Sequence, residues 1–257
     1  MEKTTVKEVM KVELKNPVLV EGLPGLGMVG RIAARYLAKQ LRAKKFAKLY
    51  SPHFPYYVLV NKKGSVRLLQ GEFYFWKNEA GENDFIFFTG DSQAQTIEGQ
   101  YDVASCVLDF AERNNVKVVV TIGGYRKEVK KTPKVVAAST SPELLKKALQ
   151  AKAIASPAGN PIVGTAGLLL GLARFRKIGA VCLLGETRGY LPDPRAAKSV
   201  LEVLQKMLKV EVDLSGLDRE IEKSKEIVDR MQEIEERREK YARKMRRTEE
   251  ERITYIS

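Results

Sequence analysis

The sequence is poor in the residues from which most catalytic and metal sites are built. Among its 257 residues it has one histidine, His53, and two cysteines, Cys106 and Cys182. One imidazole and two cysteines far apart in the chain cannot supply the ligands of a usual zinc site. Both cysteines lie within apolar runs. The sequence therefore predicts reduced thiols and a cytoplasmic protein without disulfide bonds.

Long hydrophobic runs are also missing. No uncharged apolar stretch reaches the roughly 18 residues of a membrane-spanning helix. The longest candidate, residues 161–173, is shorter and is interrupted by glycines. Residues 1–15 are charged throughout and contain no apolar core of signal-peptide length. The sequence therefore predicts neither a membrane partner nor a secretory signal.

Acidic residues are absent from one long stretch, since no Asp or Glu occurs between Arg31 and Gly71. The formal net charge is +13. Residues 213–257 carry 12 basic and 13 acidic side chains, which leaves 33 basic and 19 acidic ones in residues 1–212. A basic surface suits nucleic acid or an acidic protein. Plain solubility explains such an excess as well. Because no recognisable nucleic-acid-binding module accompanies the charge, nucleic acid is not the favoured partner.

Short apolar runs alternate with helical patterns along most of the chain. This alternation predicts an α/β fold with a central, mostly parallel (mixed) sheet flanked by helices. Turn residues at Lys63-Gly64 and Gly71 predict an early antiparallel block. The expected strands are 17–21, 58–60, 66–69, 72–76, 84–89, 116–122, 135–139 and 180–184, and the expected helices are 27–42, 96–114, one starting at 142, 164–175 and 194–208.

The composition changes near the C-terminus, which predicts a core domain over residues 1–212 and a charged helical segment over residues 213–257. Ser215 can cap a helix from Leu217 to about Arg252. Its narrow apolar stripe should pack against protein, in the same chain or across a subunit boundary. The stripe begins with Leu217, Ile221, Val228 and Met231. The last five residues, 253–257, become apolar again.

Three glycines after the first predicted strand form a possible nucleotide-binding turn. Gly25, Gly27 and Gly30 match G-x-G-x-x-G, the dinucleotide fingerprint. The carboxylate expected about 20 residues later for a ribose hydroxyl is missing. An NADP-binding enzyme using Arg31 or Arg35 would not need it. The favoured interpretation is a structural turn that lets the helix approach the sheet, with no cofactor.

A second segment, Gly90–Ala94, loosely resembles the turn that carries a nucleophilic serine. Ser92 would then need a base within hydrogen-bonding reach. The one candidate base, His53, precedes the serine in the chain, against the usual order of that class of hydrolase. A helix N-cap role for Asp91 or Ser92 is favoured.

Polar and glycine-rich segments follow two of the predicted central strands. Gly123–Arg126 follows one of them. Glu186, Arg188, Asp193 and Arg195 follow the last strand, where Asp193 before Pro194 also has the pattern of an N-cap. Since ligands of open α/β sheets bind at the carboxyl ends of strands, these segments could line a shared cleft.

Four segments together have a familiar order: GLPGLGMVG (22–30), TGDSQAQTIEGQYDVA (89–104), TIGGY (121–125) and GETRGYLPDPRAA (185–197). Over roughly residues 16–210 the chain resembles the archaeal homologues of the proteasome-assembling chaperone family. The resemblance implies an α/β domain without enzymatic activity that forms homo-oligomers, here expected to be tetramers or pentamers. It also implies binding to the α subunits of the proteasome core particle or to a paralogous chaperone.

The same resemblance implies a docking role for the C-terminal end. In this family and in proteasome activators, chains can end in a hydrophobic residue, a tyrosine and one further residue, which insert between neighbouring α-ring subunits. The corresponding residues here are Thr254, Tyr255, Ile256 and Ser257. Tyr255 is third from the end, and one extra residue moves the terminal carboxylate by roughly 3.3–3.6 Å in an extended chain.

Overall fold

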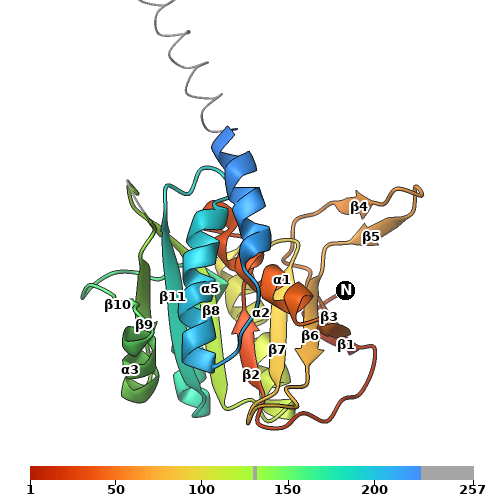
Figure 1. Cartoon of the computed structure of the whole chain (residues 1–257). Helices are drawn as coiled ribbons and strands as arrows, with labels where there is room; N and C mark the ends of the chain where they lie inside the picture. The colour runs from red at the N-terminus through yellow and green to blue at the C-terminus, as the bar shows by residue number, and fades with distance from the viewer. Residues whose placement is uncertain (130–131, 227–257) are drawn as a thin grey trace, which may run out of the picture. The chain divides into compact units, whose positions relative to one another are not determined.

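The computed structural model describes residues 1–129 and 132–226 (Figure 1). This part of the chain forms a nine-stranded sheet in the order β1-β3-β6-β7-β2-β8-β11-β9-β10 and a separate two-stranded sheet, β4-β5. The strands of the large sheet are β1 (Thr5–Glu8), β2 (Val18–Glu21), β3 (Lys44–Tyr50), β6 (Gly71–Trp76), β7 (Phe85–Gly90), β8 (Val118–Arg126), β9 (Val135–Ser139), β10 (Ile154–Ala155) and β11 (Gly179–Thr187).

The predicted mixed sheet is confirmed, but it is not mostly parallel, because parallel pairing is confined to the centre and to the edge pair β9-β10. Strands β7, β2, β8 and β11 pair in parallel. On one side β6, β3 and β1 follow with antiparallel pairing, and on the other side β9 is antiparallel to β11. Antiparallel neighbours need only a short turn, whereas parallel ones need a crossover. The sheet is therefore mixed.

Three strands of the large sheet were not expected: the edge strands β1 and β10, and β3 beside β1. In β3 three lysines, Lys44, Lys45 and Lys48, interrupt the apolar pattern of Phe46, Ala47 and Leu49. Phe46, Ala47 and Leu49 are buried. Strand β1 has a half-exposed to exposed sequence, TVKE, and is held by pairing with β3. Both strands thus form through their neighbours in space rather than through a clear local pattern.

Helices cover both faces of the sheet, with α1 against α5 and α2 against α4 (Figure 1). Alternation along β7 directs Ile86 and Phe88 into the core with α2 and α4, whereas Phe85 meets Leu37 of α1 and Leu204 of α5. The helices are α1 (Val29–Gln40), α2 (Ile97–Arg113), α3 (Pro142–Gln150), α4 (Thr165–Ala173) and α5 (Pro194–Leu208).

The helix starts confirm two of the predicted caps. The Ser141 hydroxyl accepts a hydrogen bond from the amide of Leu144, and the Asp193 carboxylate accepts one from the amide of Ala196. A proline follows each cap at the first helical position. For α2 the prediction of Asp91 or Ser92 was wrong, because the cap is Thr96.

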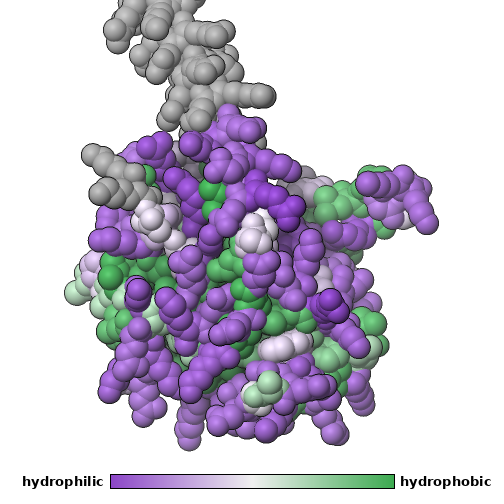
Figure 2. Space-filling model, in the orientation of Figure 1, coloured by the Kyte–Doolittle hydropathy of each residue, from purple (hydrophilic) through white to green (hydrophobic). Residues whose placement is uncertain are grey.

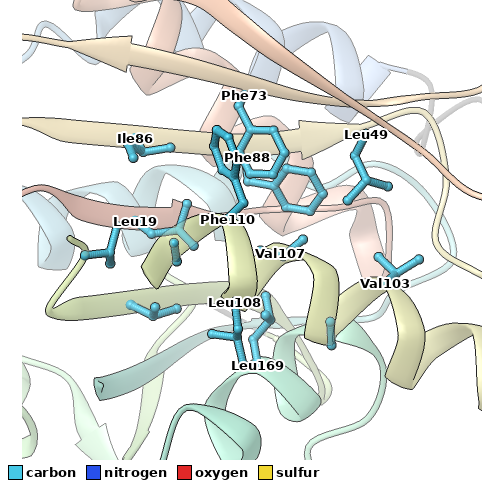
Figure 3. Packing of buried hydrophobic residues seen from close by; sticks show 14 of the residues in the cluster. Leu19, Leu49, Phe73, Ile86, Phe88, Val103, Val107, Leu108, Phe110 and Leu169 are labelled. Carbon is cyan, nitrogen blue, oxygen red and sulfur yellow. The ribbon is translucent and has the colours of Figure 1, made fainter. Parts of the chain in front are cut away.

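A core cluster between the sheet and α2 contains a layer of packed phenylalanines (Figure 3). The ring of Phe73 on β6 stacks on Phe88 of β7 at a centroid distance of 4.5 Å and meets Phe110 of α2 at 4.4 Å. Leu19 and Ile86 extend this layer toward Leu108 of α2 (Figure 3). Because these contacts hold α2 firmly, they also position its first turn, which borders the candidate site.

Strands β4 (Val58–Val60) and β5 (Val66–Leu68) form an arm that projects from the body (Figure 1). The predicted turn at Lys63-Gly64 is confirmed, and Gly64 has a φ of 78°. Gly71 was predicted to be a turn residue but is the first residue of β6. Below, "the arm" means residues 56–68.

The chain separates into two units, Met1–Leu214 and Ser215–Ser257. In the second unit, residues 215–226 are helical. The helix predicted from Leu217 therefore begins two residues earlier, and Ser215 is its first residue rather than its cap. Val228 and Met231 of its apolar stripe lie outside the described residues, so the packing of this stripe stays a prediction, as does the division into two domains. Among the described helices, none is both long enough and apolar enough to cross a membrane.

Candidate functional site

A cleft of about 650 Å³ lies at the carboxyl ends of the central strands β2, β8 and β11. This edge is where open α/β sheets bind ligands. Segments far apart in the sequence line it, and three of the four segments of the resemblance contribute. The walls include Glu21, Leu23, Gly25, Leu26, Gly30, Gln93, Gln100, Ile122, Gly123, Gly124, Tyr125, Arg126, residues 160–164, Ala166 and Leu184.

The glycine turn forms one wall of the cleft and lets α1 lie against the sheet. A Cβ atom on Gly30 would lie 2.3 Å from the carbonyl oxygen of Ile122, and one on Gly22 would lie 2.1 Å from the carbonyl oxygen of Gly30. Gly27 has a φ of 59° and Met28 a φ of 52°. Because both are left-handed, α1 begins at Val29 rather than at the predicted residue 27.

The amides of this turn are directed to the protein itself. The Gly27 amide donates to the carbonyl oxygen of Gly189 at 3.4 Å, and the Met28 amide donates to that of Gly25 at 2.9 Å. Pro24 has no amide hydrogen. A pyrophosphate cradle needs such amides free to donate. The geometry therefore agrees with the structural interpretation of Gly25, Gly27 and Gly30.

The two arginines considered for NADP do not border the cleft. Burial and the neighbouring Arg35 lower the pKa of Arg31, while the carboxylates of Asp91 and Glu72 act in the opposite direction. Arg31 thus lies among charged groups near β6 and the end of β7. This placement removes the residues on which the NADP alternative depended.

A network of amide side chains joins three walls of the cleft. Gln93 donates from Nε2 to the carbonyl oxygen of Pro24 at 2.6 Å, and its Oε1 accepts from the amide of Thr165 at 3.1 Å. Thr165 in turn donates from Oγ1 to Oε1 of Gln100 at 2.7 Å. The network ties the glycine turn to the starts of α2 and α4. Our sequence analysis missed these residues, although both glutamines lie in the 89–104 segment.

Glu21 is the one buried carboxyl group among the residues that line the cleft. Its Oε1 accepts from the amide of Leu23 at 3.1 Å, and its Oε2 has no hydrogen-bond partner. Burial raises the pKa of Glu21 to about 8, and hydrogen bonds from the amides of Leu23 and Ile122 oppose the rise. At neutral pH the group is therefore mostly protonated. The sequence analysis treated it only as the end of a strand.

This raised pKa predicts a particular pH dependence of stability. Between about pH 4.5 and pH 8 the folded chain keeps a proton on Glu21 that the unfolded chain has released, so stability falls as pH rises. The contribution reaches about 1.4 kcal/mol per pH unit. Urea unfolding from pH 5 to pH 8 should show a shallower decline for Glu21→Gln than for the wild type. Glu202→Gln, on the exposed side of α5, should keep the wild-type slope. Parallel curves for the wild type and Glu21→Gln would contradict the burial argument.

The nucleophile considered from the sequence lacks its base. The Ser92 hydroxyl donates to the carbonyl oxygen of Gln93, and the imidazole of His53 lies 3.7 Å from the carboxylate of Asp102. Burial raises the pKa of Cys106 to about 11 and that of Cys182 to about 12, so both thiols are protonated at neutral pH.

The polar cluster after β11 does not line the cleft, so that part of the prediction was wrong. Glu186 is buried and accepts from Lys127 at 2.7 Å and from the amide of Lys134 at 3.0 Å. Arg188 pairs with Glu128 at 2.9 Å, and Asp193 caps α5. These bonds hold the end of β11 in place. The prediction of a cleft was right for Gly123–Arg126, which are the last residues of β8.

The docking residues expected from the resemblance, Thr254, Tyr255, Ile256 and Ser257, lie outside the described residues. Within residues 1–129 and 132–226, no group of three or more His, Cys, Asp or Glu side chains is arranged to hold a metal ion.

A mixed sheet with helices on both faces and a cleft at the carboxyl ends of its central strands defines an open-sheet α/β protein. The PAC2 family profile matches residues 19–232, and the chain belongs to the PAC2 family. A curated relative, the uncharacterized protein MJ1210 of Methanocaldococcus jannaschii, is 34% identical over 258 residues, covering all of this chain and 98% of that protein.

Two solved structures from Pyrococcus furiosus are similar over nearly their full length. PbaB, described as an archaeal proteasome activator, is 38% identical with a TM-score of 0.86, covering 90% of this chain and 100% of that one. PbaA, described as an archaeal homologue of proteasome-assembly chaperone, is 32% identical with a TM-score of 0.74, covering 93% of this chain and 97% of that one.

Proposed function

We propose that this protein is a non-enzymatic homo-oligomer that binds the proteasome core particle, as an activator or an assembly chaperone. The similarity to PbaB carries the proposal, because it combines 38% identity with the whole length of that chain. The similarity to PbaA points to the same class of partner.

The chemistry of the cleft supports a binding role rather than catalysis. Gln93 donates to the carbonyl oxygen of Pro24, and Gln100 donates to that of Ala94. In the glycine turn, the amides of Gly27 and Met28 donate to carbonyl oxygens of the chain. Glu21 is only 1% exposed. These groups stabilise a rigid junction of strands and helices. No observation favours the nucleotide-binding enzyme, which would need free amides at Gly25, Gly27 and Gly30.

The proposed contact with the core particle runs through the C-terminal segment. Thr254, Tyr255, Ile256 and Ser257 would insert between neighbouring α subunits, as the resemblance implies. One short anchor binds weakly, but several anchors on one oligomer engage together and gain avidity. The excess of basic side chains in residues 1–212 would attract an acidic protein surface.

A pull-down with archaeal proteasome α subunits tests this function. The full-length chain should be retained, whereas a chain ending at Arg252 and a Tyr255→Ala variant should lose at least tenfold in affinity, about 1.4 kcal/mol. Thr248→Ala changes the tail outside the docking residues and should bind like the wild type. Equal retention of the shortened chain would exclude the tail from the contact. No retention of any form would overturn the proteasome assignment.

A further inference from the structure

The arm presents one continuous apolar face to solvent. The register of β4 and β5 places Val58 opposite Leu68 and Val60 opposite Val66. Alternation along each strand puts these four side chains on the same face. They are between 46% and 67% exposed, and the adjoining Tyr56 is fully exposed. Figure 2 shows apolar colour on the arm, next to the hydrophilic colour of its tip.

The other side of the arm is tied to the body. Arg67 donates two hydrogen bonds to Asp91, at 2.5 and 3.1 Å, and Asp91 also accepts from the amide of Gln70 at 3.1 Å. Strands β4 and β5 pair only with each other in the described structure. An isolated two-stranded hairpin is at best marginally stable in water. A fixed arm with an uncovered apolar face is typical of a protein interface.

The positive charge of the arm indicates which kind of surface can bind its apolar face. The tip of the arm carries Lys62 and Lys63, and the arm lies wholly within the stretch from Arg31 to Gly71 that has no acidic residue. Like charges facing each other oppose association. The arm therefore fits an apolar surface with acidic side chains better than it fits a second arm.

The chain itself has such a surface at the start of α2. Ile97 is 82% exposed, Tyr101 lies one helical turn further on and is also exposed, and Glu98 is exposed between them. The exposed Val163 lies nearby, because the hydrogen bond from Thr165 to Gln100 brings the start of α4 beside this turn. We call Ile97, Glu98, Tyr101 and Val163 the acceptor surface. Arm and acceptor surface are both exposed within one copy, so neither covers the other there.

We infer that the arm of one copy docks on the acceptor surface of a second copy. The apolar face of β4 and β5 packs on Ile97, Tyr101 and Val163, and the tip lysines approach Glu98. Each copy has one arm and one acceptor surface. Because these two surfaces differ, the contact between copies is head-to-tail. Such contacts generate a ring when the rotation closes. The inference rests on the proposed function only in requiring that the chain associates with itself.

Thiol cross-linking tests the contact directly. In a Cys106→Ser background, the full-length chain with both Val60→Cys and Ile97→Cys should give a ladder of covalent oligomers with a short bismaleimide. Each single substitution alone should give no ladder. Covalent dimers from Val60→Cys alone would show arm-to-arm packing and overturn the inference. No cross-linking of the double variant, at concentrations where the chain is oligomeric, would overturn it as well.

A charge exchange tests the same contact by another route. Lys62→Glu with Lys63→Glu should weaken self-association at least tenfold in sedimentation equilibrium, and Glu98→Lys should do the same. The triple variant should recover most of the loss, which a merely unfolded arm would not allow. Lys206→Glu on the exposed side of α5 is the control and should leave association unchanged. No recovery in the triple variant would overturn the pairing of the tip with Glu98.

The apolar face is tested by Val60→Thr with Val66→Thr, which keeps the side-chain shape and strand propensity. This variant should lose at least tenfold in self-association. Val9→Thr, at a position 64% exposed outside the arm, is the matched control. Unchanged association of the double variant would exclude the arm from the interface. A chain that stays monomeric yet is retained by proteasome α subunits would overturn this inference and the homo-oligomer in the proposed function, and would leave the proposed binding to the core particle standing.

Discussion

Replacement of Gly30 by alanine should lower the free energy of unfolding by about 3 kcal/mol or more. The added Cβ would lie 2.3 Å from the carbonyl oxygen of Ile122 and 3.2 Å from that of Leu23. Both neighbours are backbone atoms of the central sheet and the turn, so neither can rotate away. Helix α1 would have to move off β8, which would break the packing on that face. Urea unfolding monitored by circular dichroism measures the loss.

The matched control for this change is Gly171→Ala, also within a helix. Nothing lies within 4 Å of a Cβ atom at Gly171 in α4. Alanine there should raise the free energy of unfolding by about 0.5–1 kcal/mol, because glycine is the poorer helix former. Equal effects of the two substitutions would contradict the close approach of α1 to the sheet.

Replacement of Phe73 by alanine should cost about 3–5 kcal/mol. The side chain is fully buried, and its ring lies 4.5 Å from that of Phe88 and 4.4 Å from that of Phe110 (Figure 3). Removing it leaves a cavity between β6, β7 and α2 and also removes three aromatic contacts, with Phe46, Phe88 and Phe110. Thermal and urea unfolding should both record the loss.

Phe175→Ala provides the comparison, since Phe175 is 84% exposed. Its removal should change the free energy of unfolding by no more than about 0.5 kcal/mol. Phe73→Leu should lower the free energy of unfolding by an amount between those of Phe73→Ala and Phe175→Ala, because leucine keeps part of the buried volume. A small effect of Phe73→Ala would mean that the aromatic layer is not the main core of the sheet.

These two regions have consequences for function because both position the cleft and the acceptor surface. Gly30 is part of the cleft wall, and Phe110 holds α2, whose first two turns carry Ile97 and Tyr101. Variants in the core should therefore be compared with arm and tail variants only under conditions where they are folded. The arm and the tail, by contrast, can be changed without disturbing the aromatic layer.

Several features were determined by the sequence alone, because short-range chemistry decides them. Ser141 and Asp193 begin helices since their side chains accept amides three residues later. The apolar run at residues 116–122 predicts the central strand β8, because a strand buried on both faces needs apolar side chains on both. The glycines of residues 22–30 indicated a close helix–sheet contact, and the structure places that contact between Gly30 and Ile122.

Other features were decided only by tertiary structure. Whether Glu21 ends a strand in water or inside the protein depends on Gln93, Gln100 and the other residues that close the cleft, and these come from distant segments. Strands β1 and β3 form because partners are available in the sheet, not because of their own pattern. The arm's apolar residues look like ordinary core residues in the sequence. Only the path of the chain leaves them in solvent, because burial is set by contacts between residues far apart and not by the residues themselves.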